Sequence, residues 1–307
     1  MNLVNAVKSR LSVKISLTLA ALLLLLTALA GVTIIRYQTA QAEALTLEKS
    51  RLAASLGARQ WGDLLDHAID AGQLTVADVF DRSYAEVKGY TFGKQPKFHT
   101  RFDAFTDNAV LVFQDKYLDH EDFLFAVGVD ENGYLPTHNT KFQKPLTGDP
   151  EKDLVGNRTK RMFNDPVGAA AAKNLEPTLQ QVYRRDTGET LWDVSSPIWV
   201  KGKHWGGFRV GVSMERLEAR KRDLLLTLLG MFVLFALVTV GTMFAVVQRA
   251  MRPVVDLTRT AEAISIGDAL ETPIKSTSTD EIGQLTKAIE RLRKSMKAAM
   301  SRLGGEP

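Results

Sequence analysis

The sequence lacks cysteine altogether. A chain without cysteine forms no disulfide, offers no thiolate to a metal and has no thiol nucleophile. Charged residues make up 24% of the chain, yet none occurs in Ile15–Ile35 or in Leu224–Gln248. Each stretch is long enough for a helix to cross the hydrocarbon core of a bilayer, which takes about 20 apolar residues. Two membrane-spanning helices are therefore predicted.

Each predicted span is flanked by basic residues at the end nearer the chain terminus. They are Lys8, Arg10 and Lys14 before the first span, and Arg249 and Arg252 after the second. Because such residues favour the cytoplasmic side, both termini are expected there, with residues 36–222 in the periplasm of a bacterial inner membrane. The two ends account for the net charge of +4, so no nucleic-acid partner is expected.

The first span has an alternative interpretation as a cleaved signal peptide. Ala28-Leu29-Ala30 is similar to a signal-peptidase site after an apolar stretch. The apolar run continues through Val32, Ile34 and Ile35, which favours an uncleaved anchor. A mature chain that begins at Gly31 would contradict the two-span interpretation.

The segment between the spans changes from helical to strand patterns. Apolar spacing predicts a long helix from the first span to about Asp70 and a second helix over Val76–Val87. Phe123–Val129 is predicted as a strand, with Tyr134–His138 as its returning partner after a turn.

Three further strands are predicted near the end of this segment. They cover Leu179–Arg185, Thr190–Val200 and His204–Ser213. Their short links are typical of an antiparallel meander. Helices followed by such a sheet indicate an α+β fold.

Two heptad patterns follow the second span, one on each side of a polar connector. The first comprises Ala250, Val254, Leu257, Ala261 and Ile264, and the second comprises Ile282, Leu285, Ile289, Leu292 and Met296. Each pattern predicts a helix that packs into a coiled coil. Two helices make half of a four-helix bundle, so a parallel homodimer is predicted. The alternative is an amphipathic tail on the membrane surface.

Three ordered motifs accompany these heptads: Arg252-Pro253, residues 264–268 (ISIGD) and residues 280–285 (DEIGQL). With them, residues 249–300 resemble the HAMP domain of bacterial transmembrane receptors. The resemblance implies a dimeric relay in which two bundle packings convert motion of the membrane helices into output. Pro253 is expected at a helix start or kink. The expected relay residues are Pro253, Leu257, Ile264, Gly267, Leu270, Ile274, Asp280, Glu281, Ile282, Leu285 and Ile289.

Several blocks upstream carry a second resemblance. They are residues 98–103, 132–139, 153–161 and 183–189, Pro197-Ile198, Gly202 and His204-Trp205-Gly206. In this order they are similar to the Cache-type periplasmic sensor of methyl-accepting chemotaxis proteins. The resemblance implies a PAS-like antiparallel sheet behind a long N-terminal helix, with a small ligand between the sheet and its covering helix or loops.

Seven residues are candidates for contact with such a ligand: Arg158, Arg161, Tyr183, Trp192, His204, Trp205 and His138. Arg158 and Arg161 are three residues apart and would share one face of a helix. A cationic pair beside aromatic rings suits a carboxylate or another small anion.

Each candidate also has a structural interpretation. The two arginines could form ion pairs with Asp153, Asp165 or Glu176. The two tryptophans could pack in the core, and the two histidines could be satisfied structural residues.

The expected organisation has six parts. They are a cytoplasmic N-terminus (1–14), a first span (15–35), a periplasmic sensor (36–222), a second span (224–248), a HAMP domain (249–300) and a tail (301–307). No nucleophile–base pair, metal site or cofactor motif is evident, so a receptor rather than an enzyme is expected, with neither metal nor cofactor. No methylation helices or cytoplasmic phosphoacceptor histidine occur before Pro307, so output is expected through a separate chemoreceptor, kinase or cyclase.

Two other functions fit the same sequence. One is a membrane-tethered solute-binding protein without a signalling role, for which residues 253–307 would be dispensable. The other is a PAS-like haem or metal sensor that uses His138 or His204.

Overall fold

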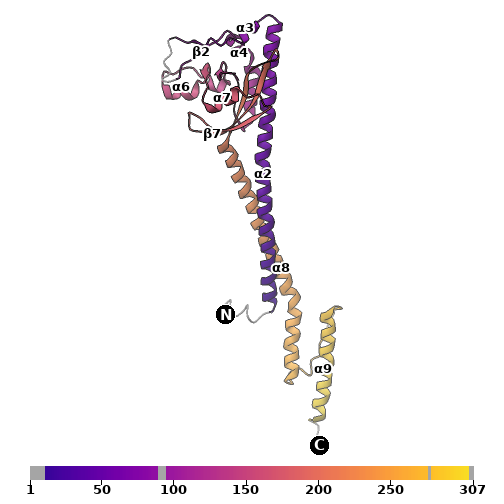
Figure 1. The fold of residues 1–307 in the computed structure, drawn as a ribbon. Helices are drawn as coiled ribbons and strands as arrows, with labels where there is room; N and C mark the ends of the chain where they lie inside the picture. The colour runs from indigo at the N-terminus through magenta and orange to yellow at the C-terminus, as the bar shows by residue number, and fades with distance from the viewer. Residues whose placement is uncertain (1–10, 89–94, 276–277, 304–307) are drawn as a thin grey trace. The chain divides into compact units, whose positions relative to one another are not determined.

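A computed structural model of the protein describes residues 11–88, 95–275 and 278–303 (Figure 1). The chain divides into two compact units. The α+β unit comprises residues 36–226, and the helical unit combines the described parts of 1–35 and 227–307. Two helices, α2 (Leu11–Asp70) and α8 (Met214–Ser265), continue without interruption from one unit into the other.

The α+β unit contains a four-stranded antiparallel sheet. In spatial order its strands are β3 (Phe123–Asp130), β8 (Lys203–Ser213), β7 (Thr190–Val200) and β6 (Leu179–Arg184). The last three follow one another in the chain and form the predicted meander.

The predicted partner of β3 is wrong, because β3 pairs with β8 rather than with residues 134–138. Residues of that segment form β4 (Tyr134–Leu135), which pairs with β5 (Arg161–Met162). The carboxylate of Asp130 accepts the backbone N–H groups of Asn132 and Tyr134. These hydrogen bonds turn the chain away from the sheet as soon as β3 ends.

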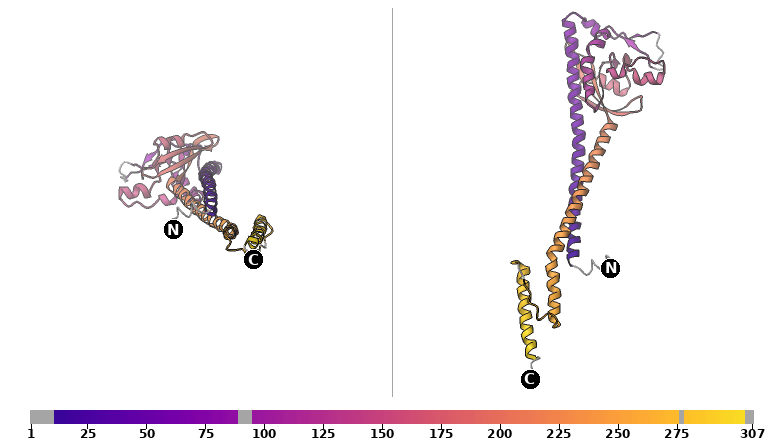
Figure 2. Two further views of the ribbon diagram at one scale, coloured as in Figure 1. Left: turned by 90° about the horizontal axis from the view of Figure 1, so that it is seen from below. Right: turned by 180° about the vertical axis from the view of Figure 1, so that it is seen from behind.

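One face of the sheet packs against the C-terminal half of α2. Phe208 and Val210 of β8 share this core with Trp61, whose side chain is fully buried. The rings of Trp61 and Trp205 lie 5.6 Å apart. A Cβ at Gly57 would meet the Phe208 ring at 2.1 Å, so the close approach of helix and sheet requires glycine there. Figure 2 shows α2 running alongside the sheet.

The opposite face of the sheet is covered by short elements. α7 (Pro166–Ala172) packs against β7 and β8, and its N-terminus is capped by Asp165, which accepts the N–H groups of Val167 and Gly168. α6 (Pro150–Gly156) begins in the same way at Asp149. A carboxylate cap followed by proline is a strong helix-start signal, which explains why these short helices form.

Seven smaller elements complete the unit. They are α3 (Val76–Val79), β1 (Ala85–Glu86), β2 (Phe98–His99), α4 (Asp103–Ala109), α5 (Leu111–Gln114), η1 (Asp115–Asp119) and η2 (Thr140–Phe142). The helix predicted over Val76–Val87 ends after one turn. Asp81 accepts the backbone N–H of Arg101, and Arg82 donates to the carbonyl of Trp205. These long-range hydrogen bonds hold the chain in a non-helical conformation that local apolar spacing does not reveal.

The helical unit contains the first part of α2, the rest of α8 and α9 (Glu281–Leu303). By length and composition, α2 and α8 are both able to cross a membrane. The two helices contact each other in this unit. Ser12 donates a hydrogen bond to the side chain of Gln248 at 3.4 Å, and Gly31 lies against the ring of Phe232.

Candidate functional site

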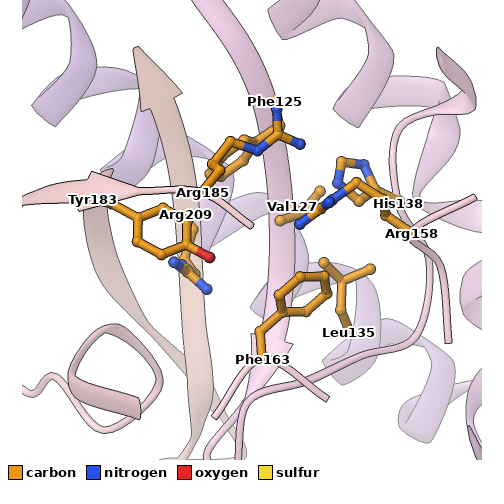
Figure 3. A pocket seen from close by; sticks show the side chains of 9 residues that line it. All are labelled: Phe125, Val127, Leu135, His138, Arg158, Phe163, Tyr183, Arg185 and Arg209. Atoms are coloured by element: carbon orange, nitrogen blue, oxygen red, sulfur yellow. The ribbon is translucent and has the colours of Figure 1, made fainter. Parts of the chain in front are cut away.

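A small cavity lies on the face of the sheet away from α2. Its volume is about 20 Å³, room for about one water molecule. Figure 3 shows the surrounding side chains converging on this space. They are Phe125 and Val127 of β3, Leu135 of β4, Tyr183 of β6, Arg209 of β8, and His138, Arg158, Phe163 and Arg185 from neighbouring loops.

The alternation of strand side chains explains how an arginine reaches this interior. On β8, Phe208 and Val210 face α2, so Arg209 between them faces the cavity. A Cβ at Gly211, the next position on this face, would come within 2.3 Å of the Phe125 ring. Glycine at that position therefore leaves room for the aromatic wall beside the arginine.

Three buried guanidinium groups line the cavity. Arg158, Arg185 and Arg209 expose 5% or less of their surface. They lie over aromatic rings. The guanidinium carbon of Arg158 is 5.3 Å from the centre of the Phe163 ring, and that of Arg209 is 5.7 Å from the centre of the Tyr183 ring. Stacking of this kind holds a guanidinium in place while leaving its edge available for hydrogen bonds.

Each of these arginines has a carboxylate partner. Arg158 pairs with Asp186 at 2.9 Å, and Arg185 pairs with Glu189 at 2.5 Å. Arg209 donates through Nε to Asp193 at 2.9 Å. Burial acts to lower the pKa of Arg209, but the adjacent Asp193 carboxylate outweighs burial and raises it. All three acids come from residues 186–193, the turn between β6 and β7 and the start of β7.

His138 is a neutral, fully enclosed member of the site. Burial, together with the charges of Arg158 and Arg185, lowers its pKa well below 6.5. Its Nδ1 accepts the backbone N–H of Asn139 at 2.8 Å, so in the neutral ring the proton is on Nε2. The imidazole therefore adds an N–H donor and no positive charge.

Tyr183 closes the side of the cavity formed by β6. Burial, and then the charge of Asp165, raises the pKa of its phenol, which keeps the hydroxyl protonated. Figure 3 shows this hydroxyl directed toward the cavity. The site thus combines cationic and neutral donors with the apolar walls of Val127 and Leu135, which suits a small anion better than an amine.

The structure divides the seven predicted ligand contacts into two groups. Arg158, Tyr183 and His138 line the cavity, and Arg161 lies next to it. Trp192, Trp205 and His204 are not brought to this cavity, because they lie elsewhere on the unit.

The two tryptophans belong to the core that α2 covers. Trp192 is buried there, and Trp205 donates its Nε1–H to the carbonyl of Val79 at 2.9 Å. His204 packs its ring against Trp199 at 5.5 Å. Among the described residues, no group of three or more histidines, carboxylates or cysteines is arranged to hold a metal ion.

The predicted relation between Arg158 and Arg161 needs correction. They do not share a helix face, because α6 ends at Gly156 and Arg161 belongs to β5. Their common partner is Asp186 rather than Asp153, Asp165 or Glu176. Folding of the β6–β7 turn, not helix periodicity, brings the pair together.

Sequence reasoning did not select Arg185 and Arg209 as site residues. Arg209 carries a usable signal, since it is a lone charge within the strand His204–Ser213, whose other residues are apolar, glycine or uncharged at its ends. Arg185 carries none, because it follows Arg184 at a strand end and only one of the two is buried.

The segment after the second predicted span forms two parallel helices joined by an anchored connector. Ile264 near the end of α8 is fully buried, and Gly267 has a φ of +91°, a value that favours glycine. The carbonyl of Leu270 accepts a hydrogen bond from Arg293 of α9, and the N–H of Ile274 donates to Glu290 at 3.0 Å. The connector is therefore bonded along the side of α9.

Asp280 caps the start of α9. Its carboxylate accepts the N–H groups of Ile282 and Gly283 at 3.0 and 3.1 Å. The hydrogen bond from the hydroxyl of Ser278, together with these backbone bonds, lowers the pKa of Asp280. Pro253 lies inside the continuous α8, so it does not start a helix; the expected kink stays a prediction.

The heptad positions of α9 are unequally covered by the rest of the chain. Thr286 and Arg293 are buried, and Arg293 bonds to the connector, whereas Leu285 is 42% exposed and Leu292 is 56% exposed. The uncovered leucines repeat at an interval of seven residues on one face. Such a face is typical of half a bundle that needs a second pair of helices.

Comparison with known families decides the nature of this segment. Residues 245–298 match the HAMP domain family. These residues form a HAMP domain. The matched range begins four residues before the predicted start at 249 and ends two residues before the predicted end at 300. The helix α8 therefore runs from the predicted second span directly into the HAMP domain.

Comparisons over the remaining chain are less informative. No curated protein matches the chain. Among solved structures, the sensor domain of DcuS from E. coli is similar, with 17% identity over 37% of this chain and 72% of that chain, at a TM-score of 0.27. A TM-score that low does not establish a shared fold. The Cache resemblance therefore stays a prediction, whereas the HAMP resemblance is confirmed.

Proposed function

We propose that this chain is a transmembrane signalling receptor that binds a small anion in the arginine-lined cavity and relays binding to its HAMP domain. One observation carries the proposal. Arg209 lies on β8, β8 ends at Ser213, and α8 begins at Met214 and continues into the HAMP domain. A single uninterrupted helix thus connects the strand that forms the cavity to the relay.

The remaining features of the proposal follow from the sequence. The uncharged stretches support α2 and α8 as spans of a bacterial inner membrane, and the basic flanks support a cytoplasmic HAMP domain. The uncovered face with Leu285 and Leu292 supports a parallel homodimer. The role needs binding and transmission only, so no chemical step is assigned to the chain, and its output passes to a cytoplasmic partner such as a chemoreceptor, a kinase or a cyclase.

The ligand class follows from the chemistry of the cavity. Stacked guanidinium groups bind carboxylates and similar oxyanions through paired, charge-assisted hydrogen bonds. The volume of about 20 Å³ requires that the site open by movement of a wall when a ligand larger than water binds. His138 and Tyr183 would donate to the same anion, and the apolar walls would contact its carbon atoms.

The direct test is a thermal-shift screen of the full chain in detergent micelles against small organic acids and amines. All four tryptophans lie between residues 61 and 205, so intrinsic fluorescence reports unfolding of the α+β unit alone. A binding anion raises the melting temperature in a concentration-dependent way, and Arg209→Met removes the rise. Stabilisation by amines only, or by no compound, would contradict the anion-receptor proposal.

A further inference from the structure

The turn between β6 and β7 brings carboxylates to the buried arginines. Asp186 places Oδ1 2.9 Å from Nη1 of Arg158 and Oδ2 3.2 Å from Nη2 of Arg161. Glu189, three residues later, pairs with Arg185. One short surface turn therefore supplies the counter-charges of three buried guanidinium groups.

Asp186 satisfies its two arginines incompletely. Arg158 and Arg161 both donate to the carbonyl of Leu154, at 3.3 and 3.2 Å, so the two cations lie side by side. Each guanidinium contributes only one nitrogen to the Asp186 carboxylate, whereas a well-oriented carboxylate takes two from one arginine. The buried Nε of Arg161 has no hydrogen-bond partner within the described parts of the chain.

Asp186 also lines a surface groove that adjoins the cavity. This open groove of about 840 Å³ is lined by Arg161, Asp186, Phe163 and Tyr183. Phe163 and Tyr183 line the small cavity as well. A small anion that entered from this groove would meet Asp186 and Arg161 there, and Arg158 where the cavity begins.

We infer that Asp186 is an internal substitute for the ligand: its carboxylate holds the position between Arg158 and Arg161 that a ligand carboxylate takes, and binding releases it. This inference rests on the proposed receptor function and adds how the empty site is kept closed. Burial acts to raise the pKa of Asp186, but Arg158 and Arg161 outweigh burial and lower it. The group is therefore a charged competitor in the empty receptor.

The register of the sheet explains how release of Asp186 changes the rest of the unit. The turn ends where β7 begins, and Leu191, the second residue of β7, pairs with Ser213 at the end of β8. Met214, the next residue, starts α8. A displaced turn therefore moves the part of β7 that lies directly beside the start of α8.

Chemical rescue by acetate tests the inference on the full chain in detergent micelles. The variants are Asp186→Ala and Asp186→Asn, with Glu86→Gln as a control that removes one exposed charge from β1. Melting is followed by tryptophan fluorescence while acetate replaces chloride at constant ionic strength and pH 7. In chloride, Asp186→Ala is expected to melt below the wild type, because two buried cations lose their carboxylate. Acetate is expected to reverse this loss, with half-saturation at about a tenfold lower concentration than in wild type or Glu86→Gln.

Each outcome has a definite meaning. Asp186→Asn keeps the shape of the side chain, so it gives the same comparison if Asp186→Ala does not fold. Equal acetate shifts in wild type and both Asp186 variants would overturn the inference while leaving an anion site in place. Absence of any acetate shift in the Asp186 variants would also overturn it, and the screen of organic acids on the wild type decides separately whether the receptor proposal stands.

Discussion

Asp193 and Arg209 form a buried ion pair across β7 and β8, with Nε of the arginine 2.9 Å from the carboxylate. Both side chains lie on the cavity face of the sheet, where Asp193 is paired with Gly211 in the strand register. The second carboxylate oxygen of Asp193 has no hydrogen-bond partner among the residues that the structure describes. Asp193 therefore fixes the guanidinium from one side, and the cavity lies on another.

Variants of this ion pair distinguish its contribution to stability from its role in anion binding. Asp193→Asn leaves the buried guanidinium without its counter-charge, and Arg209→Met leaves the buried carboxylate without its own. In either variant the free energy of unfolding is expected to fall by about 3–5 kcal/mol. The double variant Asp193→Leu/Arg209→Met removes both charges and is expected to recover most of that loss while binding no anion. Urea unfolding followed by tryptophan fluorescence measures the stabilities. A double variant as unstable as the single ones would show that the charges themselves do not determine the loss.

The buried His138 predicts a pH dependence of stability. Its pKa in the folded chain lies well below 6.5, so below about pH 6.5 the unfolded chain takes up a proton that the folded chain does not. The free energy of unfolding is therefore expected to decrease as pH falls from 6.5 toward 5, by about 1.4 kcal/mol per pH unit. The contribution is fully present above pH 6.5.

The variant His138→Gln tests the source of this slope. It is expected to flatten the dependence between pH 6.5 and 5, whereas His204→Gln, which removes a half-buried histidine outside the cavity, changes it less. The pKa of His204 is also lowered, first by burial, so it acts in the same direction. An unchanged slope in His138→Gln would contradict the neutral assignment of its ring.

The start of α9 depends on a single cap. Asp280→Ala removes the acceptor for the N–H groups of Ile282 and Gly283, at an expected cost of about 1 kcal/mol to helix stability. Asp280→Asn keeps an acceptor and is expected to cost less. Amide hydrogen exchange over residues 281–284 measures the effect as faster exchange in Asp280→Ala. Equal exchange in both variants would show that the cap does not hold the helix end.

The uncovered face of α9 predicts dimerisation through the HAMP domain. Leu285→Asp places a charge where the bundle core is expected, so the full chain in detergent should sediment as a monomer and lose signalling. Gln284→Asp introduces the same charge one residue away on an exposed, non-heptad position and should remain dimeric. A dimeric Leu285→Asp protein with normal output would contradict the relay assignment.

Features set by short-range periodicity could be predicted from the sequence. Such features are the uncharged spans, the meander of β6 to β8 and the capped heptad helix at Asp280. Each depends on residues that are close together in the sequence. The helix predicted over Val76–Val87 failed because Arg82 bonds to Trp205, a contact between residues far apart in the chain.

The cavity could be predicted only in part for the same reason. Arg158, His138 and Tyr183 were selected for their chemistry, but the meeting of Arg185 and Arg209 depends on sheet register and on the β6–β7 turn. The faces of Trp192 and Trp205 were also undecided, since large aromatic residues serve in both ligand sites and cores. In this fold both belong to the core that α2 covers.

The central claim is that anion binding in the cavity changes the packing of the HAMP helices, and disulfide cross-linking at α9 tests it most directly. The chain has no cysteine, so Leu292→Cys gives this chain its only thiol. An anion that raises the melting temperature is predicted to change the rate at which this thiol cross-links two subunits severalfold. Adding Arg209→Met to the same protein is predicted to abolish that change. A stabilising anion that leaves the cross-linking rate unaltered would contradict the account.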